Sequence, residues 1–354
     1  MNTDDPIKDD PAEEASDEER PMRILILYNL ATEVKKGTTD DLVCEKEIEI
    51  ILPLVLDLLI AKGHEVSSLQ TDLDLWENLR KCKENVDIVL NLAEGFGGGN
   101  TNETAVPAIL EVLEIPFTGA SSHNMHFTLD KEKTKLVLAS HGIPSAPHLL
   151  VRELSDIESF SLPYPVIVKP VREEASVGIT YDSVVSDIVA LRSQVQEVLS
   201  LYSQPALVEQ FIVGREVSVG VVGNGSDLRI FPPLEFVFSD SVPELKRLRS
   251  YEYKWGGGRE TMVRASLNPK MIEQLTEYSR VAHVVTDCRD YSRMDYRITE
   301  KGDVYLLEVN YNPGIGPNTH GLNNTLTMMA SFVDHSFEDL IELIITTARK
   351  RYDS

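Results

Sequence analysis

Short apolar runs alternate with longer amphipathic segments along the chain. The runs at 22–28, 64–66 and 86–92 are short and continuous, as expected for buried parallel strands. Between the first two runs, apolar residues recur at helical spacing over residues 45–61, and Gly63 follows where a helix cap is expected. This order of elements predicts a βαβ arrangement with parallel strands.

The pattern predicts three folded parts: an N-terminal α/β domain at 22–120, a central α+β module at 121–208 and a carboxyl-terminal module at 209–354. The other expected helices are 107–113, a helix opening at Asp130–Lys135, 187–201, 268–285 and 336–350, and the other expected strands are 115–119, 165–170, 205–212, 216–222, 229–238, 293–298 and 304–310.

Two of the expected strands carry polar side chains at the two-residue period of a strand. Arg293 and Asp295 share one face of the first strand, and Glu308 and Asn310 share one face of the second. Mg2+ prefers oxygen ligands, and carboxylates together with phosphates supply them in many phosphoryl-transfer sites. The stretch therefore predicts a magnesium-nucleotide site.

The alternative is that Asp295 and Glu308 are the solvated faces of an amphipathic hairpin that turns at 300–303. Leu307 and Val309 lie in a run that is too apolar for an exposed edge, and a turn-rich loop begins directly after the second strand. Ligands of α/β sheets bind at the carboxyl ends of strands, which favours the binding site.

Composition limits the classes of partner. The formal net charge of −23 argues against nucleic acid and anionic membrane surfaces, because phosphate neutralisation requires clusters of Lys and Arg. Residues 1–21 hold nine acidic side chains and almost nothing apolar, which predicts a disordered acidic tail. Three scattered cysteines, an acidic amino terminus and the absence of a run of 18 apolar residues predict a cytoplasmic protein without a zinc site.

Several motifs follow one another along the chain: Gly142-Ile143-Pro144, Val166-Ile167-Val168-Lys169-Pro170, Ser176-Val177-Gly178, the segment 208–216, Arg293-Met294-Asp295 and the segment 307–314. In this order they resemble the motifs of the D-alanine-D-alanine ligase family of the ATP-grasp superfamily. The resemblance implies an ATP-grasp fold of α/β and α+β parts, preceded by a parallel-sheet, Rossmann-like N-terminal domain.

The resemblance also implies that ATP is held between the central and carboxyl-terminal modules. The residues expected to hold ATP are Lys131, Lys169, Glu209, Ile212, Glu216 and Lys254, with Lys131 and Lys169 on phosphates, Glu209 and Ile212 on adenine and Glu216 on ribose. The loop 172–179 is expected to place backbone N–H groups near Ser176 on the phosphates. Pattern alone leaves Lys131 equally well explained as part of a solvated helix start.

The implied reaction is ATP-dependent ligation of a carboxylate to an amine through an acyl phosphate. Two Mg2+ ions, or Mn2+, are expected on Asp295, Glu308 and Asn310. Arg293 and the N–H of Gly314 are the candidates that stabilise the oxyanion, with a structural ion pair as the alternative role of Arg293.

Substrate recognition is expected to involve Glu45, or alternatively Glu47, on the ammonium of the first substrate. Thr319, or alternatively Asn318, is expected on the carboxylate of the second. The chain departs from the family at Glu94, where the family has His, at Ala175, where it has Ser, and at Trp255, where it has Tyr. These departures place D-alanine in question as the substrate, while ATP use is still expected.

Three other functions remain open beside a D-alanine-D-alanine ligase of cell-wall synthesis. They are a ligase for other amino acids or small carboxylate and amine pairs, a kinase of a small acid, and an ATP-binding protein without turnover. The expected partners are small amino-acid-like molecules, and the resemblance raises a homodimer as one option.

Overall fold

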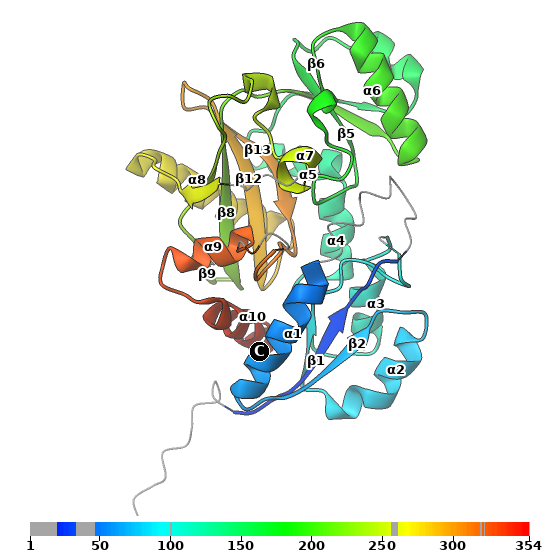
Figure 1. Ribbon diagram of the computed structural model, residues 1–354, viewed down its shortest axis with the longest axis vertical. Coiled ribbons are helices and arrows are strands. Elements are labelled where there is room, and N and C mark those ends of the chain that lie inside the picture. Colours follow the sequence, from blue (N-terminus) through cyan, green and yellow to red (C-terminus); the bar gives the residue numbers. More distant parts are fainter. Residues whose placement is uncertain are drawn as a thin grey trace, which may run out of the picture.

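The computed structural model describes residues 20–32, 47–99, 101–255, 261–318, 321 and 323–353, and only the backbone of Trp255. Three sheets form three parts of the molecule, each with its own helices (Figure 1). Almost all of the predicted acidic tail lies outside the described residues.

The first sheet is parallel, as predicted, and has the order β2-β1-β3. Its strands are β1 (Arg23–Tyr28), β2 (Glu65–Gln70) and β3 (Ile88–Asn91), and α1 (Glu47–Ala61) connects β1 to β2. Gly63 has a φ of +89°, which a residue with a side chain rarely adopts at the end of a helix. The strand expected at 115–119 is reduced to a single bridge between Phe117 and Val89.

The second sheet has four antiparallel strands in the order β4-β7-β5-β6. They are β4 (His148–Val151), β5 (Val166–Pro170), β6 (Val184–Val185) and β7 (Ala206–Gln210). The helix α6 (Ile188–Leu201) packs its buried face on this sheet, and Asp187 caps it by accepting from two backbone N–H groups.

The third sheet follows the order β11-β10-β8-β12-β13, with β9 paired to β8. Its strands are β8 (Arg215–Asn224), β9 (Asp227–Ile230), β10 (Leu234–Val237), β11 (Thr261–Arg264), β12 (Tyr291–Ile298) and β13 (Val304–Asn310). The single strand expected over 229–238 is wrong, because two prolines at 232 and 233 separate β9 from β10.

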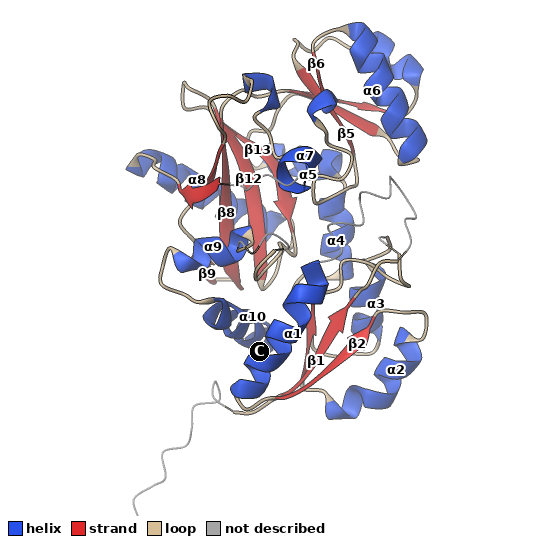
Figure 2. Ribbon diagram, in the orientation of Figure 1, coloured by secondary structure: helices blue, strands red, loops and turns tan. Residues whose placement is uncertain are grey.

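The remaining helices cover these sheets (Figure 2). They are α2 (Leu75–Cys82), α3 (Ala105–Val112), α4 (Ser122–Leu129), α5 (Lys131–Ser140), α7 (Tyr251–Trp255), α8 (Pro269–Val285), α9 (Thr325–Ser331) and α10 (Phe337–Asp353). Asp130 caps α5 and Asn268 caps α8, at the positions where these helices were expected to begin, while α4 was not expected from the sequence. Among the described residues, no helix is long and apolar enough to cross a membrane.

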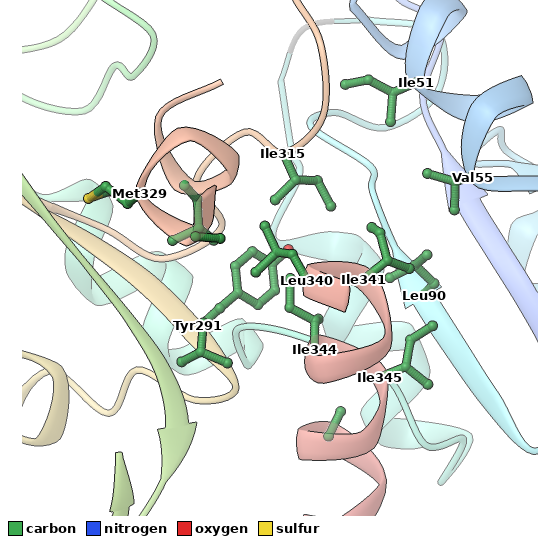
Figure 3. Packing of buried hydrophobic residues seen from close by; sticks show 14 of the residues in the cluster. Ile51, Val55, Leu90, Tyr291, Ile315, Met329, Leu340, Ile341, Ile344 and Ile345 are labelled. Atoms are coloured by element: carbon green, nitrogen blue, oxygen red, sulfur yellow. The ribbon is translucent and has the colours of Figure 1, made fainter. Parts of the chain in front are cut away.

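One apolar core joins the first and third parts of the molecule. Ile51 and Val55 of α1 lie in the same buried cluster as Ile341 and Ile345 of α10 and Leu90 of β3 (Figure 3). The carboxyl-terminal helix therefore packs between the parallel sheet and the large antiparallel sheet.

Candidate functional site

The antiparallel pair β12–β13 brings the predicted polar side chains together. Its register sets Asp295 opposite Glu308 and Arg293 opposite Asn310, with a β-bulge directly after Asp295. Cross-strand partners on one face lie close enough for their side chains to interact. The convergence expected from the two-residue period is therefore present.

The carboxylate of Asp295 accepts four hydrogen bonds. Arg293 donates through Nε at 2.8 Å and Nη2 at 2.9 Å, Ser218 through Oγ at 2.6 Å and Asn310 through Nδ2 at 3.0 Å. Burial alone would raise the pKa of Asp295, but Arg293 holds this pKa below its usual value, so the group is ionised. The ion pair left open for Arg293 is thus present in the structure.

The chemistry of this donor set fits a hard divalent cation, since it combines two carboxylates with an amide oxygen. Within the described ranges no group of three or more His, Cys, Asp or Glu side chains has metal-binding geometry. A cation held by Asp295 and Glu308 would therefore take Asn310 and phosphate oxygens as further ligands.

A buried cluster of two lysines and one glutamate lies beside this strand pair. Lys135 Nζ and Lys169 Nζ lie 2.9 Å and 2.8 Å from the two carboxylate oxygens of Glu209. Burial alone would raise the pKa of Glu209, but the two lysines hold that pKa at about 2. The side chain of Glu209 is therefore engaged by the two lysines, and β7 pairs with β4 and β5 on either side of it.

Lys135 was not singled out from the sequence, although a signal was available. It lies four residues after Lys131 in α5, so both side chains project from one face of the helix. Both lysines are buried. Lys131 Nζ donates to the backbone carbonyl of Glu173 and lies 3.5 Å from Glu308 Oε2, which rules out the solvated helix start.

A cavity between the second and third sheets, here called the inter-sheet cavity, gathers most residues expected to hold ATP. It is lined by Lys169, Ser176, Glu209, Ile212, Glu216, Asp295 and Glu308, with apolar walls from Ile167, Ile179, Phe211, Leu248 and Leu307. Glu216 Oε2 accepts from Arg297 Nη2 at 2.8 Å. A cavity that combines apolar walls with carboxylates and cations suits a flat heterocycle that carries hydroxyls and phosphates.

The loop between β5 and β6 lines one side of this cavity. Part of its backbone has the left-handed conformation. Ala175 and Ser176 have φ values of 51° and 66°, and Gly178 has 73°. A Cβ on Gly178 would lie 2.5 Å from Pro170, so only glycine fits there. Non-glycine residues held at positive φ are strained and concentrate at ligand-binding sites.

A second cavity, here called the central cavity, adjoins the inter-sheet cavity and shares Glu173 and Arg249 with it. Of the predicted residues, Glu94, Lys254, Arg293, Asn310 and Gly314 line it. Lys254, which was expected to hold ATP, therefore lines the central cavity and not the inter-sheet cavity. Desolvation by the cavity walls raises the pKa of Glu94 to about 7, with a further contribution from the carboxylate of Glu47.

The structure places Glu47, the alternative to Glu45, in the central cavity, where Glu47 Oε2 accepts from Asn324 Nδ2 at 3.0 Å. Glu45, Thr319 and the side chain of Trp255 lie outside the described residues.

Asn318 is buried and, within the described part of the chain, is absent from the lining of both cavities. Thr325, which sequence reasoning missed, lines the central cavity and accepts from Arg293 Nη1 at 3.0 Å.

Comparison with known proteins places this geometry in a family. A family model described as "D-ala D-ala ligase C-terminus" matches residues 137–346. The D-alanine-D-alanine ligase of Carboxydothermus hydrogenoformans is 30% identical over 303 residues, which are 81% of this chain and 88% of that protein.

Two solved structures share the fold over nearly the whole chain. The D-alanine-D-alanine ligase of Bacillus anthracis complexed with ATP has a TM-score of 0.69 and 20% identity, covering 94% of this chain and 99% of its own. The VanG D-Ala:D-Ser ligase of Enterococcus faecalis has a TM-score of 0.70 and 17% identity, covering 93% and 100%.

The expected ATP-grasp fold, with a parallel three-stranded sheet at the amino end, is therefore confirmed. Since the family model matches more than half of the residues and the sequence likeness extends across most of the chain, the protein belongs to the D-alanine-D-alanine ligase family of ATP-grasp ligases.

Proposed function

We propose that this protein joins the carboxylate of one amino-acid-like molecule to the amine of another, with ATP bound in the inter-sheet cavity. One observation carries the proposal: the Asp295, Glu308, Asn310 and Arg293 cluster lies where the inter-sheet cavity meets the central cavity. A γ-phosphate held at this junction would face a carboxylate held in the central cavity.

The proposed reaction has two steps. A carboxylate oxygen of the first substrate attacks the γ-phosphorus and ADP leaves, which forms an acyl phosphate. The amine of the second substrate then attacks the carbonyl carbon, inorganic phosphate leaves with the former carboxylate oxygen, and the amine loses a proton. Mg2+, when bound at Asp295, Glu308 and Asn310, supplies positive charge that offsets the charge of the transferring group.

The residues of the chain divide these tasks. Lys169 is a compact cation suited to a phosphate oxygen, and the backbone of the strained loop at 175–178 offers N–H groups. Arg293 and the N–H of Gly314 border the cavity in which the oxyanion would form. Glu47, at the start of α1, is a carboxylate suited to the ammonium of the first substrate.

The substitution Glu308→Gln tests the proposed metal role. It removes one anionic ligand while keeping shape, so ATP-dependent phosphate release should fall about 100-fold or more. Glu300→Gln, in the exposed turn of the same hairpin, is the matched control and should retain the wild-type rate. Unchanged turnover of a folded Glu308→Gln protein would reject the metal assignment.

Product analysis distinguishes the ligase from a kinase. With carboxylate and amine both present, mass detection should find the amide, ADP and phosphate in equal amounts. An acyl phosphate that accumulates in the same way with and without amine would instead establish a kinase.

A further inference from the structure

The central cavity continues into the N-terminal domain as a branch, here called the N-terminal branch. Six residues line both: Glu47, Ala93, Glu94, Asn312, Pro313 and Gly314. Beyond them, the branch runs between the carboxyl ends of β1 and β3 and the start of α1. A molecule bound in the central cavity can therefore extend a side chain into this branch.

The walls of the branch are largely apolar, and three buried polar atoms that border it have no hydrogen-bond partner among the described residues. Ile48, Ile51, Leu92, Tyr291 and Ile315 supply the apolar surface. Asn29 is 2% exposed and Asn91 1%, and both line the branch. Within the part of the chain that the structure describes, Asn29 Oδ1, Asn91 Nδ2 and Glu47 Oε1 are buried without a hydrogen-bond partner.

Such unpaired groups indicate a ligand. A buried polar atom without a partner costs free energy, so most are satisfied by protein, water or a bound molecule. Asn29 is held in place because its Nδ2 donates to the Gly99 carbonyl at 3.2 Å, which leaves Oδ1 as the acceptor. Two of the three unpaired atoms, Asn29 Oδ1 and Glu47 Oε1, accept hydrogen bonds.

The charged side chains of the branch favour one sign of charge on the ligand. Glu47 and Glu94 stand at its junction with the central cavity, and Glu94 is open to the cavity. Within the described part of the chain, the charged side chains that line the branch are these two carboxylates, and no basic side chain lines it. A cationic group in the branch would therefore be attracted, and an anionic one repelled.

We propose that the N-terminal branch binds the side chain of the first substrate and that this side chain ends in a cation, as in lysine, ornithine or arginine. Its methylene groups would pack on Ile48, Ile51 and Ile315, and its terminal N–H groups would donate to Asn29 Oδ1 and to the carboxylate of Glu94, while Glu47 holds the α-ammonium. The inference rests on the proposed ligase function and names the substrate class of the same site.

Pairs of amino acids with similar shape and different charge test the proposed cationic subsite. ATP-dependent phosphate release is measured with lysine against norleucine and with arginine against citrulline, each as D and L forms, with mass detection of products. The basic member of at least one pair should have a kcat/KM about tenfold or more above its neutral partner, equivalent to about 1.4 kcal/mol. Equal or better turnover of both neutral partners would overturn the inference and leave the ligase function standing.

Absence of turnover with every carboxylate and amine would instead contradict the proposed function. Calorimetry in the presence of ADP and Mg2+ then tests the branch independently of activity. Binding of lysine at least about tenfold tighter than norleucine supports the cationic subsite, and equal binding, or none of either, rejects it.

Substitutions of Glu94 test whether this residue recognises the charge of the substrate side chain. Glu94→Gln should raise the KM for the basic amino acid about tenfold, with a smaller change in kcat and no change in the KM for ATP. Glu94→Asp, which keeps the charge, should recover part of the loss. Glu65→Gln, an exposed carboxylate of β2 in the same domain, is the control and should match wild type. An equal loss with basic and neutral substrates would show that Glu94 has no role in charge recognition.

Discussion

Glu209 shows how a site residue is fixed by partners that are distant in sequence. Its carboxylate lies between Lys135 of α5 and Lys169 of β5, and all three side chains are buried. Removing one partner of such a cluster leaves an uncompensated buried charge, which costs much more than an exposed ion pair contributes. Glu209 therefore stabilises the wall of the inter-sheet cavity as well as bordering it.

We expect Glu209→Gln to lower the free energy of unfolding by about 3–5 kcal/mol, because two buried cations lose their counter-charge. Chemical denaturation at pH 7 measures this. Glu197→Gln, on the exposed face of α6, is the control and should change stability by less than about 0.5 kcal/mol. A loss no larger than that of the control would contradict the buried cluster.

The carboxylate of Glu209 also makes the stability of the folded protein depend on pH. The pKa of Glu209 is about 2 in the folded protein against an ordinary 4.5, so its ionised form stabilises the fold. That stability is fully present above about pH 4.5 and is lost as pH falls towards 2. The stability difference between wild type and Glu209→Gln should therefore shrink from pH 5 to pH 3, and a constant difference would contradict the low pKa.

Sequence reasoning brought the polar residues of β12 and β13 together but did not find Lys135 or Thr325. The two-residue period placed Asp295 and Glu308 on strand faces, and the antiparallel register confirms that they meet. Lys135 was missed because pairing with Glu209 depends on how α5 packs against the second sheet. Thr325 was missed because no periodic pattern links it to Arg293, which it contacts at 3.0 Å.

At the scale of elements, the hairpin between β8 and β9 depends on the backbone of one glycine. Gly223 has a φ of +133°, and a Cβ there would lie 1.9 Å from the carbonyl oxygen of Asp227. Gly225, in the same hairpin, has a φ of +56° and open space around it. An alanine at position 223 would therefore clash with the backbone, whereas an alanine at position 225 would meet only backbone strain.

We expect Gly223→Ala to lower the free energy of unfolding by about 3 kcal/mol or more, since strand pairing must open to admit the methyl group. Gly225→Ala should cost about 1–2 kcal/mol, from the left-handed backbone alone. Thermal and chemical unfolding of both variants measure the difference, and equal losses would show that the close contact at Gly223 is relieved at no cost.

Element boundaries were predicted well where a cap or a breaker marks them. Asp130, Asp187 and Asn268 cap α5, α6 and α8. The break between β9 and β10 was missed although it lies at two prolines, because the apolar pattern continues across them. The helix α4 was missed because its sequence mixes polar and apolar residues without a clear helical period.

At the scale of the molecule, the core shared by α1 and α10 couples the N-terminal domain to the carboxyl-terminal part. Further ties support it: Arg351 Nη2 donates to the Phe117 carbonyl at 2.8 Å, and Asp290 Oδ2 accepts from the Gly119 N–H at 2.8 Å. These contacts join residues far apart in sequence, so no local pattern predicts them. The boundary predicted near residue 120 therefore divides the sequence into two parts that share one apolar core in the structure.

We expect Ile345→Ala to destabilise the protein by about 2–5 kcal/mol and to weaken hydrogen-exchange protection of β1 and β3 as well as of α10. Val189→Ala, on an exposed position of α6, is the control. Protection of β1 and β3 that stays at the wild-type level would show that the N-terminal sheet is stable without the shared core.

The most direct test of the account follows oxygen from the first substrate. The amino acid that supports the fastest phosphate release is supplied with both carboxylate oxygens as 18O, and the phosphate formed is measured by mass spectrometry. Attack of the carboxylate on the γ-phosphorus predicts one 18O atom in each phosphate, together with an amide product. Phosphate without 18O would show that water attacks ATP directly, and would contradict activation of a carboxylate at the Asp295, Glu308 and Asn310 site.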